Sequence, residues 1–317
     1  MGVTRAVQNG LGPARAQGGR DERVITQEDR LNGDVAAPDV LDLADEVARA
    51  DGVEALSEQT VLELRTPVRP VRHFLAHDDG GGLVGYAQLD PGEGDEASAE
   101  LAVVPFARRR GVGRALLDAV RAAAPGVSVW AHGNLTGAQA LAASAGMSVV
   151  RELLQMSAPL GPVDATVPRH PGVVVQTFDP DRDEHDWVTL NARAFATHPE
   201  QGRMTVADLR AREAEAWFDP TLLWLVRPVT APDGAPLASM WVKVVPGERS
   251  GEIYALGVDP EAQGQGLGGM LTRRALAELH RRGLSRATLY VEGDNAAALR
   301  TYQREGFHCV AIDVQYR

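Results

Sequence analysis

The sequence predicts an α/β fold, of the mixed α+β kind, built from two copies of one unit. Its length of 317 residues suits two domains. The same order of strand, glycine-rich turn and helix occurs twice at nearly constant spacing: 155 residues separate Gly111 from Gly266, and 160 separate Gly146 from Gly306. We therefore expect a disordered tail at 1–20, a first domain at 21–157, a proline-rich linker at 158–172 and a second domain at 173–317.

The first copy predicts a helical segment followed by a hairpin. Apolar residues at helical spacing cover the region 34–64. Two apolar strands, 71–76 and 83–89, flank the turn sequence Asp78-Asp79-Gly80-Gly81-Gly82. The elements expected next are a strand at 99–105, a helix at 115–124, a strand at 127–131 and, after Asn134, a short helix at 137–144.

The second copy predicts the same order of elements. A hairpin is expected at 222–226 and 238–244, around a turn that contains Pro232, Asp233 and Gly234. The elements expected next are a strand at 253–258, a helix at 270–279, a strand at 287–291 and, after a helix cap at Asn295, a helix to Glu305.

Composition limits the class of protein. The net charge of −11 argues against a nucleic-acid partner, and no run of 18 apolar residues predicts a membrane span. The single Cys309 excludes an intramolecular disulfide and fits a reducing compartment. Residues 1–20 lack the apolar core of a signal peptide. We therefore expect a cytoplasmic protein.

Lysine is almost absent from the chain. Of the 32 basic residues only Lys243 is a lysine, which indicates a place where a compact ammonium is needed. Chance retention on a solvated strand is the alternative.

The glycine-rich turn of the second copy favours an anion-binding site. It lies between an apolar strand and an amphipathic helix, over residues 258–269. This layout directs backbone N–H groups and a helix N-terminus toward an anion, so the turn could hold a pyrophosphate without a lysine.

These repeated features resemble the GNAT superfamily of acyl-CoA-dependent acetyltransferases. Each copy has the pattern [Arg or Gln]-x-x-Gly-x-Gly, at 108–113 and 263–268, after a strand ending in Val-x-Pro and before an amphipathic helix. The resemblance implies two tandem GNAT domains, each a mostly antiparallel mixed sheet flanked by helices. It also implies acetyl-CoA as co-substrate and no metal.

Five segments of the second copy narrow the resemblance within that superfamily: His198-Pro199-Glu200-Gln201-Gly202, Trp241-Val242-Lys243, Gly251-Glu252-Ile253-Tyr254, Leu289-Tyr290-Val291-Glu292-Gly293-Asp294-Asn295 and Thr301-Tyr302-Gln303. They resemble the mycothiol synthase family, tandem acetyltransferases that acetylate the cysteinyl amine of desacetylmycothiol. The resemblance implies a monomer whose partners are acetyl-CoA and desacetylmycothiol, with neither nucleic acid nor membrane.

The resemblance also implies a coenzyme-binding set in each copy, with the strand on the pantetheine arm and the turn on the pyrophosphate. In the first copy the set is Leu101, Ala102, Val103, Arg109, Arg110, Gly111, Val112, Gly113 and Arg114. In the second it is Leu256, Gly257, Val258, Gln263, Gly264, Gln265, Gly266, Leu267, Gly268, Gly269, Asn295, Ala296, Ala297, Ala298, Leu299 and Arg300. We expect a β-bulge at Gly257 that separates its strand from the neighbouring one and leaves a backbone N–H for the thioester oxyanion.

Acetyl transfer to an amine needs a base. An α-amino group has a pKa of about 7.7–8, so a carboxylate with the usual pKa of about 4.3 would take its proton at a cost of about 5 kcal/mol. A buried carboxylate with a raised pKa is better suited. The resemblance makes Glu252 the candidate base and Tyr302 the candidate acid for the leaving thiolate, with no covalent enzyme intermediate. Alternation puts Glu252 on the face of Tyr254 and Leu256 if no bulge intervenes.

Other side chains follow from the same resemblance. The residues expected to contact the acceptor are Glu58, Glu200, Lys243, Glu252 and Tyr290. We expect Cys309 to be a buried structural thiol and not a nucleophile.

The two copies differ at the acid–base positions. Alignment of Val103 with Val258 places Ala97 opposite Glu252, and alignment of the closing glycines places Ala142 opposite Tyr302. We therefore expect a first domain that binds coenzyme without catalysing transfer. Two alternatives stay open: a tandem acetyltransferase for another small amine or a peptide N-terminus, and a non-catalytic acetyl-CoA sensor.

Overall fold

The computed structural model describes residues 25–29, 31, 37–67, 69–92, 97–161, 170–196 and 199–317. The expected tail at 1–20 lies outside these residues, as does His198. The side chain of Glu200 is also outside the description.

The elements alternate between strands and helices along the chain. The strands are β1 (Ile25–Glu28), β2 (Arg72–His77), β3 (Leu83–Asp90), β4 (Ser98–Val103), β5 (Ser128–Ala131), β6 (Val149–Pro159), β7 (Val173–Thr177), β8 (Leu223–Pro228), β9 (Ala238–Lys243), β10 (Ser250–Val258), β11 (Arg286–Glu292) and β12 (His308–Tyr316). The helices are α1 (Ala37–Asp51), α2 (Glu58–Arg65), α3 (Val112–Ala123), α4 (Thr136–Ser144), α5 (Pro180–Ala194), α6 (Pro199–Gly202), α7 (Val206–Glu213), α8 (Leu267–Arg281) and α9 (Ala296–Arg304). Short 3-10 turns are η1 (Pro105–Ala107), η2 (His132–Asn134), η3 (Pro220–Leu222) and η4 (Pro260–Ala262).

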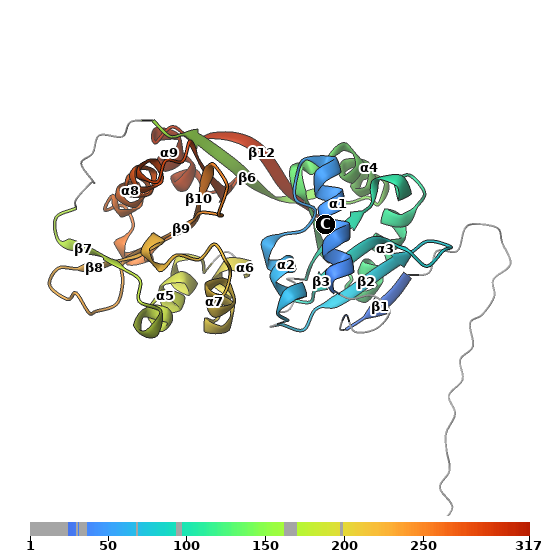
Figure 1. The fold of residues 1–317 in the computed structure, drawn as a ribbon, viewed down its shortest axis with the longest axis horizontal. Helices are drawn as coiled ribbons and strands as arrows, with labels where there is room; N and C mark the ends of the chain where they lie inside the picture. Colours follow the sequence, from blue (N-terminus) through green and yellow to red (C-terminus); the bar gives the residue numbers. More distant parts are fainter. Residues whose placement is uncertain are drawn as a thin grey trace, which may run out of the picture.

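The described strands form one twelve-stranded sheet in the order β1-β2-β3-β4-β5-β12-β6-β11-β10-β9-β8-β7. Each half of the sheet therefore holds five strands of one copy and a sixth strand from the other. Strand β12 pairs with β5, and β6 pairs with β11. In Figure 1 the helices of the two copies gather on opposite sides, and β6 and β12 run between them.

The two exchanged strands also pair with each other. Within this antiparallel pair, Leu153 lies opposite Asp313. When the copies are aligned at Gly146 and Gly306, these two residues occupy the same position of the repeat. A local pseudo-twofold axis therefore passes between β6 and β12.

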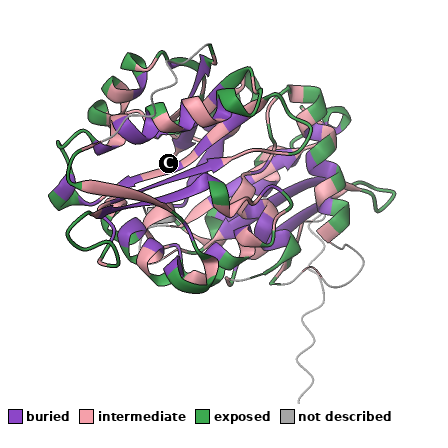
Figure 2. Ribbon diagram, turned by 60° about the vertical axis from the view of Figure 1, so that its left-hand side comes forward, coloured by how far each residue is buried: buried purple, intermediate pink, exposed green. Residues whose placement is uncertain are grey.

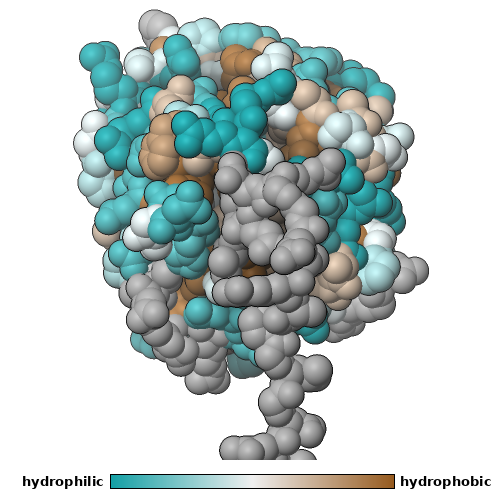
Figure 3. All heavy atoms as spheres, turned by 90° about the vertical axis from the view of Figure 1, so that its right-hand side faces the viewer, coloured by the Kyte–Doolittle hydropathy of each residue, from teal (hydrophilic) through white to brown (hydrophobic). Residues whose placement is uncertain are grey.

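Helices cover both faces of each half-sheet. In the second half, α8 and α9 pack on the face that carries Met240 and Ile253, while α5 and α7 pack on the face that carries Trp241 and Ala255. Figure 2 shows the buried strands between helices whose outer sides are exposed. On the face shown in Figure 3, hydrophilic residues predominate and hydrophobic ones appear as separate spots.

Side chains of the two halves also meet away from the exchanged strands. The guanidinium of Arg69 lies 2.9 Å from the Asp208 carboxylate, and Arg212 donates to the Gln59 carbonyl at 2.8 Å. Helix α2 of the first half is thereby held against α7 of the second.

The expected α/β architecture and the expected strands and helices of both copies are confirmed, with bounds shifted by a few residues. The helical region expected over 34–64 forms two helices, α1 and α2, and residues 34–36 lie outside the described residues. The exchange of β6 and β12 was not predicted. The domain limits at 157 and 173 stay a prediction.

The expected bulge at Gly257 is wrong. Gly257 pairs regularly with Ser239, and the register of β10 against β9 shifts between Ile253 and Ala255 instead. Tyr254 is therefore the extra residue. The glycine has a packing role, because a Cβ there would lie 3.2 Å from Ala194 of α5.

Candidate active site

The second-half turn presents an exposed helix N-terminus. Gly264 and Gly266 have φ of +76° and +83°, a left-handed conformation that favours glycine. Gly266 is the N-cap of α8, and its position provides no side chain to cap the first N–H groups. The turn from Gln263 to Gly266 is exposed. These N–H groups are therefore available to a phosphate.

The strand before this turn separates from its parallel neighbour. Strands β10 and β11 pair only from Ser250 with Arg286 to Ile253 with Leu289. Helix α9 follows the end of β11 and is capped by the Asn295 side chain, which accepts from the Ala298 N–H at 3.0 Å. The cap expected at Asn295 is confirmed. Leu256, Asn295 and Ala298 line a cavity at this separation.

The first copy repeats the geometry of the turn. Gly111 has a φ of +89° and is the N-cap of α3, again without a side-chain cap. Arg108 donates to the Val103 carbonyl at 2.9 Å, and its counterpart Gln263 donates to the Val258 carbonyl at 3.4 Å. The first copy lacks the asparagine cap, since Asn134 accepts from the Tyr316 hydroxyl and Leu135 precedes α4.

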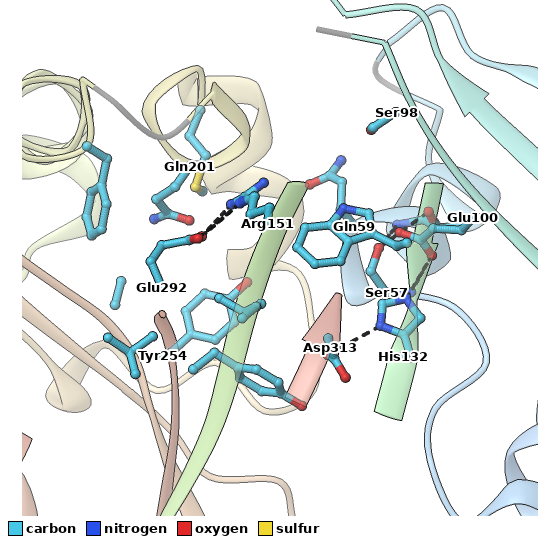
Figure 4. Close-up of a pocket in the computed structure, with 18 of the residues that line it drawn as sticks. Ser57, Gln59, Ser98, Glu100, His132, Arg151, Gln201, Tyr254, Glu292 and Asp313 are labelled. Carbon is cyan, nitrogen blue, oxygen red and sulfur yellow. Dashed lines mark hydrogen bonds and ion pairs between the residues drawn. The ribbon is translucent and has the colours of Figure 1, made fainter. Parts of the chain in front are cut away.

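A cavity of about 360 Å³ lies between the two halves. Its second-half wall contains Leu256, Tyr302, Tyr254 and Tyr290, which lie near the separated strands. Its first-half wall is polar, with side chains from α2, β3, β4 and η2. Figure 4 shows side chains from both halves around this space. Glu252, Lys243 and Glu58 lie beside the cavity's Tyr254 and are not among its lining residues.

Glu252 is a half-buried carboxylate with a perturbed acidity. Burial raises its pKa to about 7; the Lys243 ammonium opposes this shift, and Glu58 adds to it. Lys243 is the β9 partner of Glu252, so the two side chains share one face of the sheet. The value matches what a general base near neutral pH requires.

Lys243 is held by three groups. Its ammonium forms an ion pair with Glu58 of the first half at 2.5 Å, and it lies 4.8 Å from the centre of the Trp217 ring and 5.4 Å from that of Tyr254. Such contacts orient a cation. The structure thus brings together Glu58, Lys243 and Glu252.

The bulge at Tyr254 alters the expected face of Glu252. Cross-strand partners share a face, and Ile253 and Leu256 both pair with residues of the α8 side. The expected alignment required that no bulge intervene, and this condition is not met. Glu252 therefore shares its face with Tyr254, as expected, but lies on the opposite face from Leu256.

Two tyrosines lie on the cavity. Tyr302 of α9 is buried, packs edge-on against Phe307 and has a pKa raised by burial. Tyr290 of β11 is 43% exposed and its hydroxyl accepts from Gln155 at 2.9 Å. Burial and the negative charge of Glu252 raise the pKa of Tyr290. Both phenols are therefore protonated near neutral pH.

The sequence did not single out a charged group on the first-half wall. His132 lies 3.5 Å from Glu100 and 3.4 Å from Asp313, and Arg151 pairs with Glu292. Burial opposes protonation of His132, but hydrogen bonding and the charges of the two carboxylates raise its pKa to about 10. A lone histidine and two separated acidic residues carry no local pattern, so only the fold brings them together.

The expected burial of Cys309 is wrong. Cys309 lies on the exposed start of β12, and its thiol donates to the Ala311 carbonyl.

Among the described residues, no helix is long and apolar enough to cross a membrane, and no group of three or more His, Cys, Asp or Glu residues is arranged to hold a metal.

Comparison with known proteins identifies the family. The acetyltransferase (GNAT) family model matches residues 186–307, and an acetyltransferase (GNAT) domain model matches residues 69–146. A mycothiol acetyltransferase of Beutenbergia cavernae is 48% identical over 298 residues, covering 91% of this chain and 98% of that protein. A mycothiol acetyltransferase of Kineococcus radiotolerans is 51% identical over 293 residues, covering 90% of this chain and 94% of that protein. The chain belongs to the mycothiol acetyltransferase family.

Solved structures agree on the fold of this family member. A tandem GNAT protein from the clavulanic acid biosynthesis pathway superposes with a TM-score of 0.68 at 22% identity, covering 93% of this chain and 98% of that one. A GCN5-related N-acetyltransferase from Sphaerobacter thermophilus superposes with a TM-score of 0.66 at 22% identity, covering 94% of this chain and 95% of that one. The expected tandem GNAT fold and the expected class, an acetyltransferase, are confirmed. GNAT acetyltransferases use acetyl-CoA as co-substrate.

Proposed function

We propose that the protein transfers the acetyl group of acetyl-CoA to the cysteinyl amine of desacetylmycothiol and releases mycothiol and CoA. The observation that carries the site assignment is the half-buried Glu252, whose pKa is raised to about 7 beside a cavity walled by both halves. The names of the relatives support the choice of acceptor.

In this proposal acetyl-CoA lies along the second half. Its pyrophosphate binds the N–H groups of the turn that ends at Gly266, and its pantetheine arm lies between β10 and α9, where β10 has separated from β11. The thioester then reaches the cavity near Leu256 and Tyr302. No metal takes part.

Glu252 accepts the proton that the amine loses. Proton transfer from an ammonium with a pKa of about 7.7–8 to a carboxylate with a pKa of about 7 costs roughly 1 kcal/mol, against about 5 kcal/mol for an ordinary glutamate. The amine nitrogen attacks the thioester carbon directly. A backbone N–H of β10 beyond Ile253, where this strand no longer pairs with β11, stabilises the resulting oxyanion.

Tyr302 assists the leaving thiolate. Because burial raises the pKa of Tyr302 well above that of an ordinary phenol, and so above that of a thiol, complete proton transfer to the CoA thiolate is uphill. We therefore assign Tyr302 the role of hydrogen-bond donor to the CoA sulfur, with protonation completed from solvent. This role of Tyr302 is narrower than that of the general acid expected from the resemblance, because it includes no complete proton transfer.

The acceptor's cysteinyl end lies at Glu58, Lys243 and Tyr290 in this proposal, with Glu200 as a further contact. The first half binds coenzyme at its own turn without catalysis, since neither acid–base residue has a counterpart there: Ala142 occupies the position of Tyr302. The expected pairing of Ala97 with Glu252 is wrong by one residue, because Tyr254 is an extra residue in β10 and none is inserted in β4; Ser98 occupies the sheet position of Glu252 and is not a carboxylate base. We also propose a cytoplasmic monomer without nucleic-acid or membrane partners.

The test is release of CoA thiol from acetyl-CoA with a panel of amines. We expect rapid release with desacetylmycothiol and at least a hundred-fold smaller kcat/KM with aminoglycosides and peptide N-termini. Preference for one of those amines would replace the acceptor while keeping the reaction. Tight acetyl-CoA binding without thiol release for any amine would indicate a sensor.

A further inference from the structure

On the first-half wall of the cavity, a triad of ionisable groups from three separate elements lies in mutual contact. Glu100 lies on β4, His132 on η2 and Asp313 on the exchanged strand β12. Figure 4 shows His132 between the two carboxylates. The Glu100 carboxylate also accepts from the Ser57 N–H at 2.7 Å, and that of Asp313 accepts from the Gly133 N–H at 2.6 Å. The backbone therefore fixes both carboxylates.

This group is not required by the fold. In the second copy, Ala255 stands at the position of Glu100 when Val103 and Val258 are aligned. Leu153 stands at the position of Asp313, directly opposite it across the pseudo-twofold axis. The same architecture thus forms with apolar residues at both positions. Buried charged groups cost free energy that apolar residues at the same positions would not cost. Binding of a ligand therefore explains the presence of these charged groups better than a structural role does.

The imidazole retains hydrogen-bonding capacity. His132 Nε2 is buried and lies 3.5 Å from the Glu100 carboxylate, an ion-pair contact that is longer than an ordinary hydrogen bond. Its ring stacks on Trp130 at 6.4 Å with an interplanar angle of 8°, and the Arg151 guanidinium lies 4.9 Å from the Trp130 ring centre. The ring is held in place, as a preorganised binding group should be.

The chemistry of this wall suits hydroxyl groups. Two carboxylates accept hydrogen bonds and a protonated imidazole donates them, so one surface can satisfy neighbouring hydroxyls that both donate and accept. A phosphate would meet two negative charges, and an ammonium would meet the His132 cation. A neutral polyol avoids both repulsions.

We propose that Glu100, His132 and Asp313 form the subsite for the polyhydroxylated cyclitol end of the acceptor. This inference rests on the proposed function, because it assumes an acceptor whose amine lies at Glu252. The cavity then spans the substrate: the second half holds the reacting amine, and the first half holds the inositol. The first copy has lost catalytic groups and supplies specificity instead.

The experiment compares two acceptors and two isosteric variants. Asp313→Asn and Glu100→Gln each remove a charge and keep an oxygen to accept the backbone N–H. The acceptors are desacetylmycothiol and cysteinyl-glucosamine, which lacks the inositol. Asp233→Asn, in the exposed turn between β8 and β9, is the matched control.

We expect both variants to raise KM for desacetylmycothiol about ten-fold or more, with kcat changed less than three-fold and KM for acetyl-CoA unchanged. With cysteinyl-glucosamine the variants should match the wild type. Equal losses with both acceptors, or no loss with either, would overturn the subsite.

A second measurement separates this inference from the proposed function. If the wild type does not acetylate desacetylmycothiol, the proposed function fails, and binding of glucosaminyl-inositol is then measured by calorimetry. Binding by the wild type that is weakened at least ten-fold in Asp313→Asn would still support the subsite. Equal binding by both proteins, or none by the wild type, would refute it.

Discussion

Lys243 contacts Glu58 across the boundary between the two halves and is the cross-strand partner of Glu252 within its own half. One ammonium thus lies between a carboxylate of the first copy and the proposed base of the second. The charge of the first copy therefore influences the acidity of the base, and this coupling can be measured.

Replacement of Glu252 should remove proton transfer. We expect Glu252→Gln to lower kcat by about 10²-fold or more, with KM for acetyl-CoA nearly unchanged, in steady-state thiol-release assays. Arg109→Ala, in the exposed first-half turn, should leave turnover nearly intact. Equal losses in the two variants would contradict the division of labour between the copies.

The pH profile should report Glu252. Because the base must be deprotonated, kcat/KM should rise with pH through about 7. Lys243 lowers the pKa of Glu252, so Lys243→Met should move this limb to higher pH. Glu58 raises that pKa, so Glu58→Gln should move the limb to lower pH. Shifts in the same direction would mean that these charges do not act through Glu252.

Tyr302→Phe should lower kcat by about ten-fold, because the variant keeps the ring that packs on Phe307 and loses the proposed donor to the sulfur. The acidic limb of the pH profile should not move, since the pKa of Tyr302 lies above the range of the assay. A changed limb with unchanged kcat would argue against this role.

Gly251, next to the proposed base, has no room for a methyl group. A Cβ there would lie 2.2 Å from the buried Leu279 side chain of α8. We expect Gly251→Ala to reduce the free energy of unfolding by about 1–3 kcal/mol in urea titrations. Gly137→Ala, in α4 with open space around it, should be neutral or slightly stabilising. Equal effects would show that β10 and α8 adjust freely.

Local patterns predicted the repeated elements, because hairpins, glycine turns and amphipathic helices are encoded within short stretches. The pairing of β6 with β11 could not be predicted in this way, since alternating apolar residues specify a strand and not its neighbour. The sequence favours Gly257 for the bulge, because glycine in a strand often marks one. Here Tyr254 occupies it, beside the aromatic cluster around Trp241.

The residues of the candidate site also fall into two groups, those that the family resemblance identifies and those that only the fold brings together. Glu252, Lys243 and Glu58 were named through family resemblance, and the structure brings them together. Glu100 and Asp313 are 213 positions apart in the chain and meet only because β12 crosses into the first half. No short motif could have joined them.

The crossing of β12 also sets an order for folding during synthesis. Domains generally fold as units, starting from the N-terminal one while the ribosome is still adding residues. Here the first half cannot complete its sheet until the ribosome has made residues 308–316, because one edge of β5 pairs with β12. Until then β5 is an open edge, and the nascent chain is exposed to pairing with other chains along it. The two copies therefore finish folding together.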